Sequence, residues 1–452
     1  MKRRLLPILF ALSGAIAGCA DTAAPGARAQ APAVPAPAPV TPAVATQAPA
    51  PAPVAAAKPP AAPLRAPAPA AAPAAPAPGP EAAFVAPAPI KFEDALQRAG
   101  SELMRNAQAV VGSEPRTLVI DPLIDANTGA QTASTVAMGN QLEAIAKRTA
   151  PAWKVQPLTR QALASQPLLL IGTLTPVTVE RSIDKQPDAY RIWLTVIDLR
   201  SNKVVAKNLD RATVDSVNPE PLPFYRDSPT WHKDKTVLGY INSCQVNTRI
   251  GDPPDPDYIH HLQAAALINE AITAYDSGQL PAAQRLYRES AAIADPGDLR
   301  VWNGLYLTSW QLGQRDAAKE AFAKLVDSGL DAKRLPVKIL FQPGRTSFNA
   351  IGDLPAQYDL WINTLAHEAG DVPSCVRVVG HTSRTGSVGA NEVLSRRRAE
   401  TIADMLKARN RSLGARLSVA GMGSREALVG LGTDDQRDAL DRRVEFRVVD
   451  CV

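Results

Sequence analysis

One stretch near the C-terminus decides the fold of the last quarter of the chain: residues 391–406 read NEVLSRRRAETIADML. Leu394, Ile402 and either Met405 or Leu406 lie on one stripe at three- and four-residue steps, which predicts an amphipathic helix. Arg398 lies on the same stripe. Because a buried charge without a partner is costly, we expect Arg398 to contact an anion, either an internal carboxylate or an anionic ligand.

The segments around this helix predict strands. Residues 376–387, VRVVGHTSRTGS, alternate apolar and polar positions and then enter a glycine-rich turn. LSVAGMG at 417–423 and RRVEFRVV at 442–449 are two further strand signals. The C-terminal part therefore combines strands with at least one helix.

This block resembles the OmpA-like peptidoglycan-binding domain family. The resemblance is carried by ILFQ at 339–342, GHTSRTGS at 380–387, NxxLSxxRA at 391–399, GMG at 421–423 and DRRVEF at 441–446. It implies a βαβαββ domain over residues 337–452, about a quarter of the chain.

The resemblance also implies a binding pocket for the zwitterionic end of a diaminopimelate side chain in the peptidoglycan peptide. In the family, an Asp that closes a Gly-x-Thr-Asp turn takes the ammonium, and the helix Arg, matched here by Arg398, takes the carboxylate. Ser383 stands where the family has that Asp, and a hydroxyl carries no opposite charge. Thr382, Asn391 and Leu394 complete the implied peptidoglycan-binding set, and we expect binding to be weaker, altered or lost.

The alternative for Arg398 is a structural role. An ion pair with Asp441 or Glu445 would tie the domain together and leave no binding function for the guanidinium.

The N-terminus predicts export and a lipid anchor. A basic start and the apolar run Leu5 to Leu12 form a signal peptide over residues 1–18, too short to span a bilayer. The sequence Ile16-Ala-Gly-Cys19 resembles the bacterial lipobox, which implies acylation of Cys19 with palmitate-type chains. An ordinary signal peptide with an incidental cysteine is the alternative. Ala20 follows the cysteine, so the family rule for inner-membrane retention is not met and the outer membrane is implied.

An Ala/Pro-rich tract occupies residues 19–90. Of the 41 prolines, 20 lie between Asp21 and Ile90, with almost no charges or large hydrophobic residues. Such a composition cannot form a core and predicts a disordered, extended tether of polyproline character.

Residues 91–245 alternate between strand and helix patterns. Strands are expected at 117–124, 153–158, 168–174, 190–199 and 204–209, and helices at 135–147 and 160–165. We predict a small periplasmic α/β sandwich. It resembles LpoB-type activators of penicillin-binding proteins, which implies docking on other envelope proteins; a generic α/β domain without a transferable role is the alternative.

Residues 258–332 contain an internal repeat. Four pairs of residues stand 35 positions apart: Leu267 and Trp302, Gly278 and Gly313, Ala283 and Ala318, and Tyr287 and Phe322. The segment resembles two tetratricopeptide repeats, fewer than an independent solenoid needs. It is interpreted either as a peptide-binding groove or as a plain four-helix segment that packs the two α/β domains together.

The cysteines suggest one disulfide. Cys375 opens a predicted strand and Cys451 follows the last one, so antiparallel pairing of these strands would bring the two thiols together. Cys244 would then be free or the partner of another chain.

Nothing in the sequence predicts an enzyme, a metal or a cofactor. Asp252 to His261 gathers possible metal ligands, but prolines and aspartates before a helix are typical of a linker with an N-cap. Nucleophile elbows, phosphate loops and zinc-binding helix motifs are absent from the sequence. A net charge of +5 without a basic tract does not favour nucleic acid.

These patterns together predict an outer-membrane lipoprotein, facing the periplasm, that joins the membrane to peptidoglycan. Its expected partners are the bilayer, through acylated Cys19, and the peptidoglycan peptide, through Arg398. The alternative is a scaffold or activator that recruits an envelope protein complex through residues 91–332.

Overall fold

The computed structural model describes residues 87–451 except 179–186, 334 and 351, all within the compact unit Gly79–Val452. The predicted signal peptide, Cys19 and the Ala/Pro tract up to residue 86 lie outside the described residues. Within them, no helix has both the length and the apolar character needed to cross a membrane.

The first sheet has the strand order β3-β1-β4-β5-β6, with β2 paired to β4. The strands are β1 (Thr117–Ile120), β2 (Ile124–Asp125), β3 (Lys154–Pro157), β4 (Leu168–Val177), β5 (Ala189–Asp198) and β6 (Lys203–Thr213). β1 pairs in parallel with β3 and β4, whereas β4, β5 and β6 are antiparallel. The single strand predicted at 117–124 is two strands, and Pro122, which cannot donate to a ladder, lies between them. At the β5–β6 turn, Asn202 has the positive φ of 52° that such turns favour.

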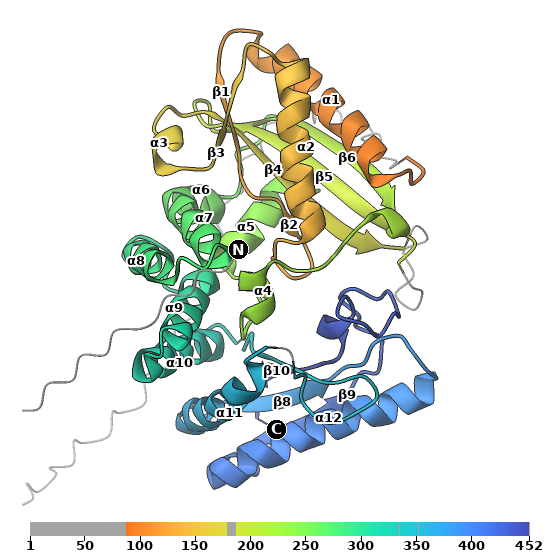
Figure 1. Cartoon of the computed structure of the whole chain (residues 1–452), viewed down its shortest axis with the longest axis vertical. Helices are drawn as coiled ribbons and strands as arrows, with labels where there is room; N and C mark the ends of the chain where they lie inside the picture. Colours follow the sequence, from red (N-terminus) through yellow and green to blue (C-terminus); the bar gives the residue numbers. More distant parts are fainter. Residues whose placement is uncertain (1–86, 179–186, 334, 351, 452) are drawn as a thin grey trace, which may run out of the picture. The chain divides into compact units, whose positions relative to one another are not determined.

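Both faces of this sheet are buried. Leu168 and Leu170 of β4 pack with α1 (Phe92–Val111) and α2 (Ala133–Thr149), which Figure 1 shows over one side of the strands. Leu169 and Ile171, pointing the other way, pack with α5 (Lys235–Cys244), α6 (Pro256–His260) and α7 (Leu262–Asp276). Because strand side chains alternate between faces, a nearly continuous apolar run is the sequence signature of a strand buried on both sides.

Helices α7, α8 (Leu280–Ala291), α9 (Leu299–Gln311) and α10 (Arg315–Asp331) pack in succession. The 35-residue pattern has a direct counterpart in this geometry. Gly278 and Gly313 both turn with φ of +73°, and the paired Ala283 and Ala318 are both fully buried. Equivalent sequence positions therefore play equivalent packing roles in the two helix pairs.

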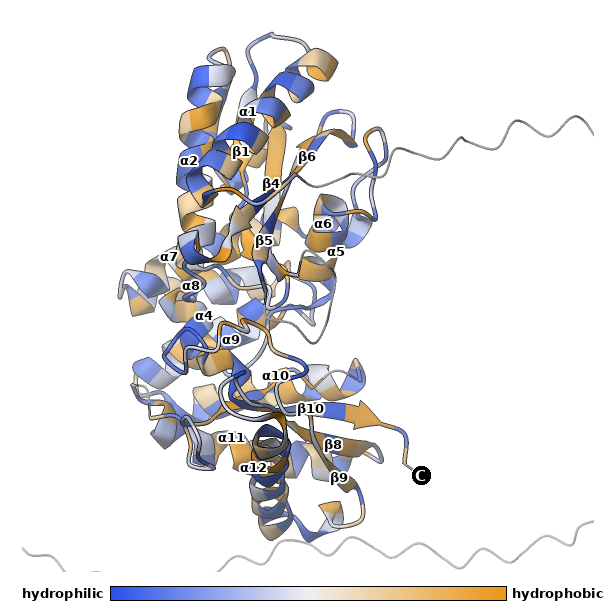
Figure 2. Ribbon diagram, turned by 90° about the vertical axis from the view of Figure 1, so that its right-hand side faces the viewer, coloured by the Kyte–Doolittle hydropathy of each residue, from blue (hydrophilic) through white to orange (hydrophobic). Residues whose placement is uncertain are grey.

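The second sheet has the order β7-β10-β8-β9 and carries two helices. Its elements are β7 (Lys338–Leu340), α11 (Leu354–Asp371), β8 (Cys375–Gly380), α12 (Val388–Arg409), β9 (Leu417–Gly421) and β10 (Arg443–Val449). β8 and β9 are parallel, and β10 lies antiparallel to β7 and β8. The mixed α/β class and the βαβαββ order predicted from the sequence are confirmed. Figure 2 shows α12 as largely hydrophilic along its length.

The helical repeats and the C-terminal sheet share one hydrophobic core. The hydroxyl of Tyr306 on α9 donates a hydrogen bond to Gln357 on α11, and the indole of Trp361 donates to that same hydroxyl, each over 2.6 Å. Helices α9 and α11 are therefore joined by direct side-chain contacts as well as by this core.

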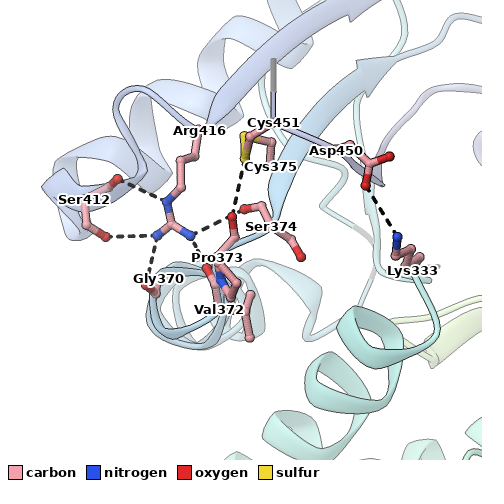
Figure 3. Close-up of a disulfide and its surroundings, with 10 residues drawn as sticks. All are labelled: Lys333, Gly370, Val372, Pro373, Ser374, Cys375, Ser412, Arg416, Asp450 and Cys451. Atoms are coloured by element: carbon pink, nitrogen blue, oxygen red, sulfur yellow. Dashed lines mark hydrogen bonds and ion pairs between the residues drawn. A yellow bond between two sulfur atoms is a disulfide. The ribbon is translucent and has the colours of Figure 1, made fainter. Parts of the chain in front are cut away.

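A disulfide joins Cys375, the first residue of β8, to Cys451 beyond the end of β10 (Figure 3). The antiparallel pairing places Val449 opposite Cys375, so the two cysteines lie at one end of the ladder. Beside them, Arg416 donates to the carbonyl oxygens of Gly370 and Val372. Cys244 is a buried free thiol.

A close contact in the repeats gives a stability prediction. Gly304 of α9 faces the Tyr287 ring so closely that an added Cβ would overlap the ring atoms. We expect Gly304→Ala to lower the free energy of unfolding by about 1–3 kcal/mol, the usual cost of overpacking. Urea denaturation of the full chain measures this change.

The matched control is Gly139→Ala in α2, where the nearest atom to an added Cβ is a Leu123 methyl at 3.9 Å. There, the better helix propensity of Ala should stabilise the protein by up to about 1 kcal/mol. Equal effects of the two substitutions would contradict the packing argument.

Candidate functional site

Arg398 lies on the buried face of α12. Its side chain has no exposed surface, whereas the preceding Arg396 and Arg397 are exposed. Ile402 and Leu406 on the same stripe are buried, as expected, while Leu394 is only partly buried. The sequence pattern thus placed the guanidinium correctly within the helix packing.

Three backbone carbonyls accept hydrogen bonds from Arg398. Nε donates to the oxygen of Arg345 (2.9 Å), Nη1 to that of His381 (2.9 Å) and Nη2 to that of Gln342 (2.8 Å). The guanidinium also lies 5.3 Å from the centre of the Phe341 ring. One residue of α12 therefore fixes both the segment after β7 and the turn after β8.

The expected anionic partner is not present among the described residues. Asp441 instead accepts the backbone N–H groups of residues 428–430, and Glu445 pairs with Arg443 and Arg447. The interpretation in which Asp441 or Glu445 pairs with Arg398 was wrong, because the dipoles of three carbonyls stabilise the desolvated guanidinium instead. An anionic ligand of Arg398 stays a prediction.

Arg398 remains a cation at neutral pH. Burial, together with the nearby charge of Arg442, lowers the pKa of its guanidinium to about 10, and the Asp434 carboxylate acts in the opposite direction. Its five N–H groups exceed the three carbonyls it reaches, leaving one on each terminal nitrogen. A ligand carboxylate can accept from these two N–H groups only if the residues that cover Arg398 move, because the side chain has no exposed surface.

The turn after β8 brings the other predicted site residues close to Arg398. The amide of Thr382 donates to the carbonyl of Gly423 (2.9 Å), while its buried hydroxyl has no partner in the described part of the chain. Ser383 donates its hydroxyl to a carboxylate oxygen of Asp434, over 2.5 Å. A carboxylate is therefore in direct contact with the position where the family motif has an acid.

Asn391 holds this turn in place. It is buried at the start of α12, and its amide donates to the carbonyl of Thr385 over 3.0 Å. Among the predicted residues, Arg398, Thr382, Ser383 and Asn391 are thus gathered around one turn.

Two glycines allow α12 to approach the strand ends. A Cβ on Gly380 would overlap the carbonyl of Ser395, and one on Gly421 would come within 2.7 Å of the Arg396 amide nitrogen. The Ser395 hydroxyl accepts the amide of Gly423 (2.9 Å). These glycines and the serine set the distance between the helix and the turns that form the site.

The loop between β9 and β10 supplies residues that the sequence motifs did not single out. Arg442, almost completely buried, lies 3.4 Å from Asp434 and donates to the carbonyl of Asp435. Asp434 is 51 residues from Ser383 in the chain, so spacing alone could not reveal their contact. The pairing of β8 with both β9 and β10 brings these loops together.

Possible metal ligands gather around His381 and in residues 252–261, and both places bear on the prediction of no metal. His381 lies near Glu426 and Glu445, but both carboxylates already pair with Arg447. Burial and the charge of Arg443 lower the pKa of His381 to about 4. In the 252–261 segment, Asp255 caps α6 by accepting the amide of Asp257, as expected of a linker with an N-cap.

The contacts of Arg398 predict a structural cost for its replacement. Arg398→Lys keeps the charge but loses the planar fork that reaches three carbonyls. We expect the free energy of unfolding of the full chain to fall by about 1.5–3 kcal/mol, the contribution of a hydrogen bond to a charged group. The urea midpoint reports this change.

Arg397→Lys, one position earlier and exposed, is the matched control and should change stability by less than about 0.5 kcal/mol. A similar midpoint for both variants would show that the three carbonyl contacts contribute little.

Comparisons with known proteins address the same region. Residues 340–440 match the model of the OmpA family. The peptidoglycan-binding protein ArfA of Mycobacterium tuberculosis (strain H37Rv) is 36% identical over 96 residues, which are 21% of this chain and 28% of ArfA. ArfA of Mycobacterium bovis gives the same values. The chain thus spans little more than a quarter of the length of these curated relatives.

Solved structures are similar over the same part. The peptidoglycan-associated lipoprotein from Burkholderia pseudomallei is 22% identical, covering 25% of this chain and 89% of its own, with a TM-score of 0.21. The OmpA-like domain of FopA1 from Francisella tularensis is 24% identical, covering 26% and 75%, with a TM-score of 0.19. By the family match, residues 340–440 of this chain are an OmpA family domain.

Proposed function

We propose that this protein is an outer-membrane lipoprotein that binds peptidoglycan non-covalently and so joins the membrane to the cell wall. The observation that carries the proposal is the position of Arg398 within an OmpA family domain. Its guanidinium is fixed by three carbonyls and keeps two N–H groups for a ligand carboxylate. The peptidoglycan-binding name of the curated relative supports the same ligand.

The proposed role is binding and not catalysis. The buried Arg398 has the donors to recognise a carboxylate, and the Ser383 hydroxyl donates a hydrogen bond to the Asp434 carboxylate. The residues gathered at this turn therefore fit recognition of the charged end of a peptide better than bond cleavage.

The lipid anchor and the Ala/Pro tract complete the proposal. Acyl chains on Cys19 would hold one end in the outer membrane, since each buried methylene contributes about 0.8 kcal/mol. A tract of polyproline character extends by at most about 3.1 Å per residue, which would let the folded part reach the wall.

Sedimentation with purified sacculi tests the wall-binding role. The detergent-solubilised full chain should cosediment, and Arg398→Lys should weaken binding about tenfold or more, because it loses the two-pronged carboxylate contact. Arg397→Lys should bind as the unchanged protein does. Circular dichroism and the urea midpoint establish that each variant is folded during the assay.

Absence of cosedimentation by the unchanged protein would refute the wall-binding proposal. The scaffold alternative would then be the remaining interpretation.

Cell fractionation tests the anchor separately. Cys19→Ser removes the thiol that would be acylated, so the protein should leave the membrane fraction and lose incorporation of labelled palmitate. Ser13→Ala, in the same predicted signal peptide, should leave both readouts unchanged. Retention of the Cys19→Ser variant in the outer membrane would contradict lipid anchoring.

A further inference from the structure

We propose that Asp434 supplies the negative charge that Ser383 lacks, so that its carboxylate binds the ammonium group of the ligand whose carboxylate Arg398 receives. This assignment rests on the proposed wall-binding function. In the family motif the acid lies in the turn after β8, whereas in this chain we assign it to the loop before β10.

The first support is direct contact. The Ser383 hydroxyl donates to Oδ1 of Asp434 over 2.5 Å, and Thr385 donates to the Ser383 oxygen over 3.4 Å. The Ser383 hydroxyl therefore orients the Asp434 carboxylate by a hydrogen bond. The negative charge lies on the side chain next to the position where the family motif has its Asp.

The second support is that the loop carrying Asp434 is held in place. Asp438 is fully buried, and its carboxylate accepts the backbone amides of Leu431 (3.1 Å), Thr433 (2.6 Å) and Asp434 (3.3 Å). Asp434 itself adopts a φ of +55°, a region that Asp tolerates better than most residues. The anchoring amides therefore hold the backbone of the loop in place at Asp434.

The third support is that Asp434 is available to a ligand. Its side chain is 32% exposed, whereas Asp438 and Asp441 are fully buried and hold backbone amides. Oδ1 also lies 3.4 Å from Nη1 of Arg442, but no hydrogen bond from the described residues reaches Oδ2. An ammonium has three N–H donors and can use that free oxygen.

The charges at the site suit a zwitterion. Arg398 and Arg442 are two buried cations. Asp434 forms an ion pair with Arg442, and its charge opposes the lowering of the Arg398 pKa that burial causes. A ligand end that presents a carboxylate to the guanidinium and an ammonium to Asp434 adds no net charge while pairing both of its groups. A purely anionic ligand would instead meet the Asp434 carboxylate, which opposes its binding.

The main competing explanation is that Asp434 only neutralises Arg442. Two experiments on sacculus binding by the full chain separate the explanations, because the ammonium of the ligand can be removed chemically. Treating sacculi with acetic anhydride converts free amino groups to neutral amides while leaving the carboxylates in place.

The first experiment compares Asp434→Asn on untreated and acetylated sacculi. Asn keeps an oxygen that accepts from Ser383 but removes the charge, so we expect binding to untreated sacculi to weaken about 10- to 100-fold. Acetylation of the sacculi should weaken binding by the unchanged protein by a similar factor. It should not change binding by Asp434→Asn. Asp435→Asn, at a neighbouring exposed acid paired with Arg437, should behave as the unchanged protein.

The second experiment restores the acid at the family position. Ser383→Asp combined with Asp434→Asn should recover binding and its sensitivity to acetylation. Unfolding by urea shows whether the variants remain folded, and the acetylation result on the unchanged protein needs no variant at all.

Three results would overturn the assignment while leaving wall binding intact: an unchanged protein that ignores acetylation, an Asp434→Asn variant that binds normally, or a double variant that recovers nothing. If acetylation weakens binding by Asp434→Asn by the same factor as binding by the unchanged protein, the two losses are independent. Asp434 would then serve only to neutralise Arg442. Failure of the unchanged protein to bind untreated sacculi would refute the proposed function itself, and this assignment with it.

Discussion

The C-terminal domain depends on one buried cation that is stabilised by neutral groups. Arg398 connects α12 to the carbonyls of Gln342, Arg345 and His381, so the helix, the segment after β7 and the turn after β8 share one guanidinium. Removing a charge from water is costly, and the three carbonyls offset part of that cost in the folded state. The positions of the remaining site residues follow, because the turn that carries Thr382 and Ser383 starts at one of these carbonyls.

Much of this fold was predictable because its signals are local. Four-residue spacing placed Arg398 on the buried stripe of α12, and alternating or continuous apolar runs predicted most strands of both sheets. The 35-residue repeat predicted which alanines and aromatic residues become buried in α8 and α10. The break at Pro122 was missed because a short apolar run on either side of a proline reads as one strand.

The site was only partly predictable. The motif identified the turn and the arginine, but the internal partners of Arg398 were expected to be carboxylates and are carbonyls, because sequence patterns do not show where backbone carbonyls point. Asp434 was missed for a different reason. Its contact with Ser383 depends on two loops that meet only after β8 pairs with β10, and no periodicity connects them.

The buried state of Arg398 also shapes the energetics of recognition. An exposed arginine loses hydration when it binds a carboxylate, whereas Arg398 has already lost it on folding. Binding of the proposed ligand therefore requires movement of covering groups, and its apparent affinity is reduced in proportion to the fraction of molecules in which the guanidinium is open. In return, the two donors left on its terminal nitrogens meet the ligand in a medium of low polarity, where each hydrogen bond is stronger than in water. Under the proposed function, the affinity of this domain depends on how often the site opens and on the charge that Asp434 presents beside it.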